Sequence, residues 1–109
     1  MFGQVQSNTE RVTQAMRVLS RDQFIEMSDP SLVVGRSIPP TNAVSEILNH
    51  ANVQAQNKTL VIGTGAGYVA ALLSRLCAQV VAVEINPSIA KFAQDRFNKL
   101  GLANLIMRV

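Results

Sequence analysis

Three glycines at alternating positions follow a short apolar run and could bring a ligand against bare backbone. The stretch from Leu60 to Tyr68 reads LVIGTGAGY, with glycine at Gly63, Gly65 and Gly67. Where a buried strand turns into a helix, the first helical amides have no backbone partner and carry partial positive charge. Glycine admits positive φ and places no side chain in the way of a ligand. The spacing predicts a turn that binds a nucleotide-like ligand.

A carboxylate at the end of the next apolar run could bind the sugar of such a ligand. Glu84 closes the run VVAVE about twenty residues after Gly63, the spacing at which an acidic residue meets ribose hydroxyls. It would accept two hydrogen bonds from a vicinal diol. The dinucleotide fingerprint G-x-G-x-x-G has glycine where Tyr68 stands, so the pattern departs from it by one position. Two structural alternatives stay open: the glycines could only pack helix on strand, and Glu84 could be a solvated strand end.

The elements that must position these groups alternate between strand and helix. TLVIG from Thr59 predicts a buried strand, and VVAVE predicts a strand buried on both faces because it lacks alternation. The other expected landmarks are a helix over Tyr68–Leu76, a helix capped by Asn86 and Pro87 that ends at Gly101, and a third strand from Asn104. The short connections predict an α/β fold with a parallel sheet, and residues 59–109 form its β-α-β-α-β cofactor-binding unit.

Helical segments are expected before the first strand. Ser7 and Glu10 have capping-box spacing, and an apolar stripe at helical spacing follows them. The segment from Ser28 to Pro40 is rich in proline and predicts a loop, after which Thr41 is expected to cap a helix. Residues 1–58 therefore form an N-terminal helical segment and loop, in one domain with residues 59–109.

Composition restricts the classes of function. The 109 residues suffice for one domain, and only 16% are charged, so much of the chain is expected to be buried. The net charge of +3 is scattered, which disfavours nucleic acid and lipid partners. No apolar run reaches the ~18 residues of a membrane span and no signal peptide is evident, so a cytoplasmic location is expected. With Cys77 and His50 as the single cysteine and histidine, no disulfide, metal cluster or Ser-His-Asp triad is expected within one chain.

These motifs resemble the first motifs of class I methyltransferases that use S-adenosyl-L-methionine. More narrowly, LVIGTGAGYVAALLSRL and VVAVEINP are similar to protein-L-isoaspartate O-methyltransferases, whose corresponding stretch reads I-G-T-G-S-G-Y. RVTQAMRVLSRDQFI fits that family's R-V-x-x-A-M-x-x-V-x-R-x-x-F helix, and NKLGLANLIMRV fits its second helix and third strand. The resemblance runs from about residue 11 to residue 109. It implies the N-terminal half of a Rossmann-like class I methyltransferase sheet, with helices before the first strand.

The resemblance also implies a cofactor, a reaction and a set of site residues. The cofactor would be S-adenosyl-L-methionine, and the reaction would be methyl transfer to the carboxylate of isoaspartyl residues, a protein repair. Cofactor contacts would come from Gly63, Thr64, Gly65 and Gly67 for the methionine portion, Glu84 for the ribose, Ile85 for the adenine, and Ser37 and Ile38 in the loop that matches the family's G-x-T-I-S-x-P segment. Direct transfer depends on positioning and water exclusion, so no catalytic residue is assigned.

Two departures from the family pattern predict that the 109-residue chain is weakly active or inactive. In GRSIPPT, Pro39 stands at the family's active-site serine, and proline has neither a hydroxyl nor a backbone N–H. The chain also ends at Val109, before the family's G-D-G turn and remaining strands. One edge of the first strand is then expected to lack a partner and to invite homo-oligomers. The alternatives are a non-catalytic interaction module and, less favoured because of Tyr68, an NAD-binding half-domain.

Overall fold

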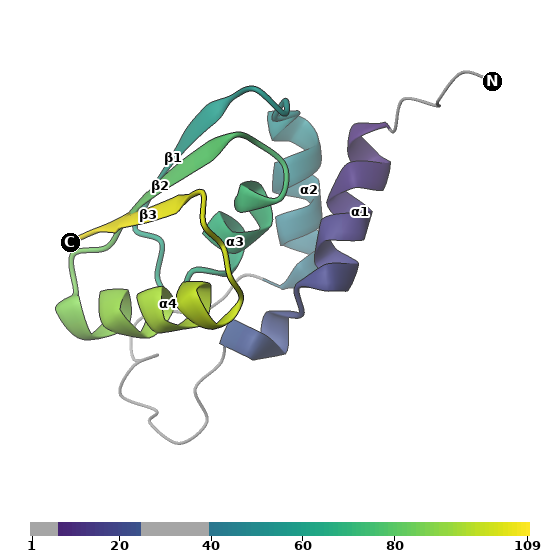
Figure 1. The fold of residues 1–109 in the computed structure, drawn as a ribbon. Coiled ribbons are helices and arrows are strands. Elements are labelled where there is room, and N and C mark those ends of the chain that lie inside the picture. Colours follow the sequence, from purple (N-terminus) through teal and green to yellow (C-terminus); the bar gives the residue numbers. More distant parts are fainter. Residues whose placement is uncertain (1–6, 25–39) are drawn as a thin grey trace.

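A three-stranded parallel sheet forms the centre of the molecule (Figure 1). The computed structural model describes residues 7–24 and 40–109. The strands are β1 (Lys58–Ile62), β2 (Gln79–Val83) and β3 (Leu105–Arg108), parallel and in the order β1-β2-β3. A helix connects each strand to the next. The predicted α/β fold with a parallel sheet is confirmed.

Side-chain caps define the starts of two helices. The helical segments of the described residues are α1 (Asn8–Val18), the 3-10 turn η1 (Arg21–Phe24), α2 (Thr41–Ala51), α3 (Tyr68–Ser74) and α4 (Pro87–Lys99). The Ser7 hydroxyl accepts the amide of Glu10 at 3.1 Å, as the capping-box spacing predicts. Asn86 Oδ1 accepts the amides of Ser88 and Ile89 at the start of α4. Both caps satisfy amides that the helix itself leaves unpaired.

The start of α2 differs from the expectation. Thr41 is the first helical residue, and Pro40 occupies the cap position with an extended backbone and no side-chain hydrogen bond. The Pro40 carbonyl accepts the amide of Val44 at 3.1 Å, so the first helical bond forms from the proline. The assignment of Thr41 as the cap is therefore wrong by one residue.

Two polar side chains of α1 attach it to the rest of the fold. The Arg11 guanidinium donates to the carbonyls of Val53 at 2.7 Å and Leu76 at 2.5 Å, which follow α2 and α3 respectively. Asn8 Nδ2 donates to the Asn49 carbonyl at 2.9 Å, near the end of α2. The Asn8 bond satisfies a carbonyl that the end of α2 leaves without an intrahelical partner, and the Arg11 bonds attach α1 to the segments that follow α2 and α3.

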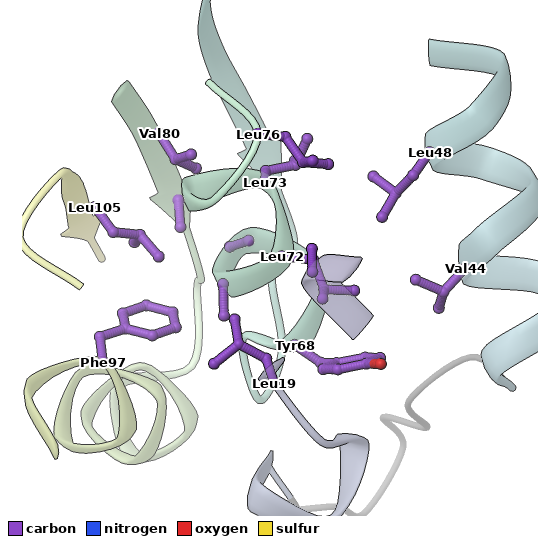
Figure 2. Packing of buried hydrophobic residues seen from close by; sticks show 14 of the residues in the cluster. Leu19, Val44, Leu48, Tyr68, Leu72, Leu73, Leu76, Val80, Phe97 and Leu105 are labelled. Carbon is purple, nitrogen blue, oxygen red and sulfur yellow. The ribbon is translucent and has the colours of Figure 1, made fainter. Parts of the chain in front are cut away.

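The core lies between one face of the sheet and the helices. Figure 2 shows Val80 and Leu105 extending from the strands toward α3 and Phe97. From α2, Val44 and Leu48 point toward α3. The side chains of Leu72 and Leu73 on α3 are buried, and so is that of Leu76 shortly after the end of α3. The sheet is thereby held against α3 and α4, with α2 packed behind α3.

The first strand is less buried than its sequence suggests. Leu60 is 60% exposed and Ile62 is 78% exposed, whereas Val61 between them is half-buried against the core. The helices of the described ranges pack against only one face of the sheet, so alternate residues of β1 face away from them. The prediction that this apolar strand is buried is wrong for one of its two faces.

Candidate functional site

The glycine turn wraps around the end of the neighbouring strand. As the chain leaves β1, the amides of Gly63 and Thr64 both donate to the carbonyl of Val83, at 2.8 and 3.0 Å. Gly63 and Gly65 have φ of +70° and +58°, in the left-handed region that favours glycine. The end of β2 therefore fixes where the turn begins, and the two glycines allow its path.

The three glycines serve different purposes. A Cβ built on Gly67 would lie 2.5 Å from the ring of Phe97, a buried residue of α4. Apart from its chain neighbours, a Cβ on Gly63 or Gly65 would meet no atom of the described residues within 4 Å. The packing alternative therefore accounts for Gly67, because a side chain there would collide with α4. It does not account for Gly63 and Gly65, which leave open space beside their backbone.

The carboxylate of Glu84 joins the two loops at the ends of β1 and β2. Its side chain is fully buried, so the alternative of a solvated strand end is wrong. Oε1 accepts the amide of Gly65 and Oε2 accepts the amide of Asn86, each at 2.9 Å. Each carboxylate oxygen can accept more than one hydrogen bond. The acid predicted from spacing thus lies against the glycine turn.

One buried polar atom of the turn has no hydrogen-bond partner among the residues that the structure describes. Thr64 Oγ1 is buried and forms no hydrogen bond with the described residues. An unpaired buried hydroxyl costs about 1–3 kcal/mol, and such a group needs an explanation. A ligand with a polar group at this turn would supply one.

The remaining residues expected to contact the cofactor are Ile85, Ser37 and Ile38. Ile85 is 82% exposed beside Glu84, which leaves its surface available for a flat apolar group. The candidates Ser37 and Ile38, together with Pro39, lie outside the described residues. The assignment of cofactor contacts to the residues of the turn, to Glu84 and to Ile85 stays a prediction.

Tyr68 packs in the core beneath α3. Its ring lies 5.6 Å from that of Phe24, centroid to centroid, and the residue is buried. Burial raises the pKa of the Tyr68 phenol, and the positive charge of Arg21 partly offsets this effect. The position of Tyr68 therefore supports a role in packing.

Two contributors to the site were missed by the sequence reasoning. Asn86 was expected only as a helix cap, yet its amide also binds Glu84. The ring of Phe97 sets the requirement for glycine at Gly67, and no local motif indicates this contact. The E-x-N spacing could have indicated the contact between Glu84 and Asn86. The contact between Gly67 and Phe97 depends on how α4 crosses the turn.

Among the described residues, the potential metal ligands, including Cys77 and His50, do not form a second candidate site. Within residues 7–24 and 40–109, no group of three or more His, Cys, Asp or Glu side chains could hold a metal ion. Cys77 is buried, and the exposed His50 has its Nε2 atom 4.0 Å from Oε1 of Glu46. No helix in the described part of the chain is long and apolar enough to cross a membrane.

A parallel sheet with a glycine turn after β1 and a buried carboxylate after β2 is the arrangement of a Rossmann-like α/β fold. Comparison with known proteins narrows this class. The family model of protein-L-isoaspartate(D-aspartate) O-methyltransferase (PCMT) matches residues 3–109, and the chain belongs to this family. The resemblance inferred from the motifs is thereby confirmed.

Individual relatives agree with the family assignment. Protein-L-isoaspartate O-methyltransferase 1 of Syntrophobacter fumaroxidans is 36% identical over 108 residues, which cover 91% of this chain and 50% of the relative. Protein-L-isoaspartate O-methyltransferase of Methanoculleus marisnigri is 34% identical over 105 residues, which cover 88% of this chain and 48% of the relative. The chain therefore spans about half the length of these curated relatives.

Solved structures support the same fold. A protein-L-isoaspartate O-methyltransferase superimposes with a TM-score of 0.74 at 23% identity, covering 91% of this chain and 37% of that one. A SAM dependent methyltransferase from Aquifex aeolicus gives a TM-score of 0.57 at 26% identity, covering 71% of this chain and 44% of that one. The first likeness shows that the chain has the methyltransferase fold predicted for it.

Proposed function

We propose that this chain supplies the cofactor-binding half of an S-adenosyl-L-methionine-dependent protein-L-isoaspartate O-methyltransferase, which repairs damaged proteins by methylating isoaspartyl carboxylates. The observation that carries the proposal is the buried carboxylate of Glu84, bonded to Gly65 beside the open space over Gly63 and Gly65. Membership of the family and the dependence of the Aquifex neighbour on this cofactor support it.

The residues of the turn fit the proposed cofactor. The ribose offers a vicinal diol, whose two hydroxyls can donate to a carboxylate such as that of Glu84. The methionine portion offers a carboxylate and an amine, either of which would satisfy the unpaired hydroxyl of Thr64. The exposed side chain of Ile85 would contact the adenine ring. Polar and apolar groups of the turn thus match the polar and apolar parts of the cofactor.

The proposed reaction requires the protein to orient the two reactants and does not require it to transfer a proton. When bound, the cofactor supplies an activated methyl group. The acceptor carboxylate is already ionised at neutral pH, since its ordinary pKa lies near 4, so it needs no general base. Alignment of two reactants can contribute about 7–11 kcal/mol to lowering the barrier. The role of the glycine turn and Glu84 is to hold the donor in one orientation.

Calorimetric titration of the 109-residue protein with S-adenosylhomocysteine tests the cofactor assignment. We expect binding by the wild type and a loss of about tenfold in affinity for Glu84→Gln, a change of roughly 1.4 kcal/mol. Glu46→Gln is the matched control, because Glu46 is an exposed acid on α2. The absence of heat and of a thermal shift at millimolar ligand would exclude this cofactor, and preferential binding of NAD would favour the dinucleotide alternative.

We also assign the protein to the cytoplasm. The single cysteine, Cys77, is buried and fits a reducing compartment, where structural disulfides are rare. Cell fractionation followed by detection of the protein with an antibody tests this location. Recovery of the protein in the extracellular fraction would contradict it.

A further inference from the structure

The three residues that connect β2 to α4 are held by polar contacts more than by packing. Residues 84–86 belong to no helix or strand, and the side chain of Ile85 in their middle is exposed. The backbone amide of Glu84 donates to the Arg108 carbonyl at 3.0 Å, which attaches the start of the connection to β3. Because Ile85 contributes little packing, the path of the connection beyond Glu84 depends on the hydrogen bonds of Asn86.

Asn86 forms hydrogen bonds in two directions. Its side-chain Oδ1 accepts the amides of Ser88 at 3.0 Å and Ile89 at 3.2 Å, at the start of α4. Its carbonyl accepts the amide of Ala90 at 2.9 Å, and its own amide donates to Oε2 of Glu84 at 2.9 Å. The same residue therefore joins the first turn of α4 to the buried carboxylate.

The cap limits how the backbone of Asn86 can turn. The residue has φ of −86° and ψ of 114°, in the extended region. The following Pro87 disfavours the helical region at this position but leaves a broad range of extended conformations. The bonds from Oδ1 to two helical amides narrow that range, because the side chain reaches both amides from a small set of backbone conformations. The side chain of Asn86 thereby directs its amide at Glu84.

The glycine turn contacts the other oxygen of the same carboxylate. The two amides at the start of the turn donate to the carbonyl of Val83, and the amide of Gly67 donates to the carbonyl of Thr64. The amide of Gly65 instead donates to Oε1 of Glu84. A displacement of the carboxylate would therefore release the middle of the turn while both of its ends stayed bonded.

The orientation of the carboxylate decides how well it can bind a diol. A vicinal diol presents two hydroxyls at a fixed separation, and hydrogen bonds weaken steeply when donor and acceptor are poorly aligned. The side chain of Glu84 is fully buried, so the protein around it sets its orientation. A contact that fixes this carboxylate therefore also fixes how strongly a diol is preferred.

We propose that Asn86 is a positioning residue for the cofactor site. By capping α4 and donating to Oε2, it holds the carboxylate of Glu84 against the glycine turn in the orientation that selects a ribose diol. Asn86 acts through Glu84 and does not itself contact the ligand. The statement about the ribose rests on the proposed function, whereas the statement about Glu84 and the turn does not.

Amide hydrogen exchange of the 109-residue protein, followed by nuclear magnetic resonance, tests the contact without any ligand. Asn86→Ala removes the cap but keeps the backbone amide. We expect the Gly65 amide to exchange about fivefold faster in this variant, the change in local opening that corresponds to the loss of a typical cap. Asn86→Ser should restore the wild-type rate to within about twofold, because serine also caps helices. Ser7→Ala is the matched control, since it removes the cap of α1.

Ligand discrimination provides a readout that a general loss of stability would not change. Calorimetry compares S-adenosylhomocysteine with the analogue that lacks the ribose 2′-hydroxyl. We expect the wild type to prefer the complete ligand by about tenfold or more, as for a hydrogen bond to a charged group. Asn86→Ala should reduce this preference to about threefold or less, because the carboxylate is no longer aligned with the diol. Asn86→Ser should recover the preference, and Ser7→Ala should not alter it.

The outcomes separate the positioning role from the proposed function. Faster exchange at Gly65 together with a reduced preference in Asn86→Ala supports both statements. Unchanged exchange at Gly65, or equal acceleration by Asn86→Ala and Ser7→Ala, overturns the positioning role. No preference in the wild type, or an unchanged preference in Asn86→Ala, overturns the statement about the ribose. A wild type that binds neither ligand contradicts the proposed cofactor, and the exchange rate of Gly65 then still decides whether Asn86 positions Glu84.

Discussion

At the scale of single residues, chemical type and spacing predicted which groups matter but not which atoms they meet. The position of Glu84 after the second strand followed from the sequence, because a strand, a turn and a helix of ordinary length bring an acid there. Its bond to the Gly65 amide did not, since that contact depends on how the turn crosses the end of β2. For the same reason, the sequence could not show that packing requires glycine at Gly67 but not at Gly63 or Gly65. This difference depends on the position of Phe97.

The difference between the glycines yields a stability prediction. Gly67→Ala should lower the free energy of unfolding by about 2–4 kcal/mol, because the new Cβ would collide with Phe97 at a φ of +97°. Gly65→Ala should cost only about 1 kcal/mol, from the left-handed backbone conformation alone. Urea unfolding followed by circular dichroism measures both. Equal losses for the two variants would show that Phe97 does not set the requirement.

At the scale of secondary structure, the order of strands and helices was predictable because periodicity and caps are local signals. Ser7 and Asn86 both cap helices as expected. The exposure of β1 was not predictable, since an apolar run without alternation has the same sequence whether one face or both are covered. The role of Arg11 was not evident either. It appeared only within a family motif, and its acceptors Val53 and Leu76 lie far away along the chain.

Arg11 should stabilise the attachment of α1 to the other helices. Arg11→Lys should lower the free energy of unfolding by about 1–3 kcal/mol, because an ammonium group cannot reproduce the fork that reaches two carbonyls. Arg17→Lys, an exposed position in the last turn of α1, should change it by less than about 0.5 kcal/mol. Guanidinium unfolding at matched ionic strength provides the comparison. If both variants unfold at the same denaturant concentration, the two carbonyl contacts contribute little.

At the scale of the whole molecule, the residues proposed to bind the methyl donor can be considered separately from those that would position the methyl acceptor. The described glycine turn, Glu84 and Ile85 contain every group that the resemblance assigns to the cofactor except Ser37 and Ile38. None of the described residues has been assigned to the acceptor. Because the chain spans about half of its relatives, binding and turnover need not occur together in it.

This separation predicts binding without turnover by the 109-residue chain. Incubated with S-adenosyl-L-methionine and an isoaspartyl peptide, it should release at least about a hundredfold less methyl ester than the full-length Syntrophobacter relative. An unpositioned acceptor loses much of the 7–11 kcal/mol that alignment contributes. Radiolabelled methyl transfer at saturating cofactor measures the rate. Pro39→Ser should raise the rate of the chain, because the resemblance places a serine hydroxyl at this position, whereas Pro40→Ser should not. Turnover by the chain alone at the rate of the full-length relative would show that acceptor positioning is already complete within these 109 residues.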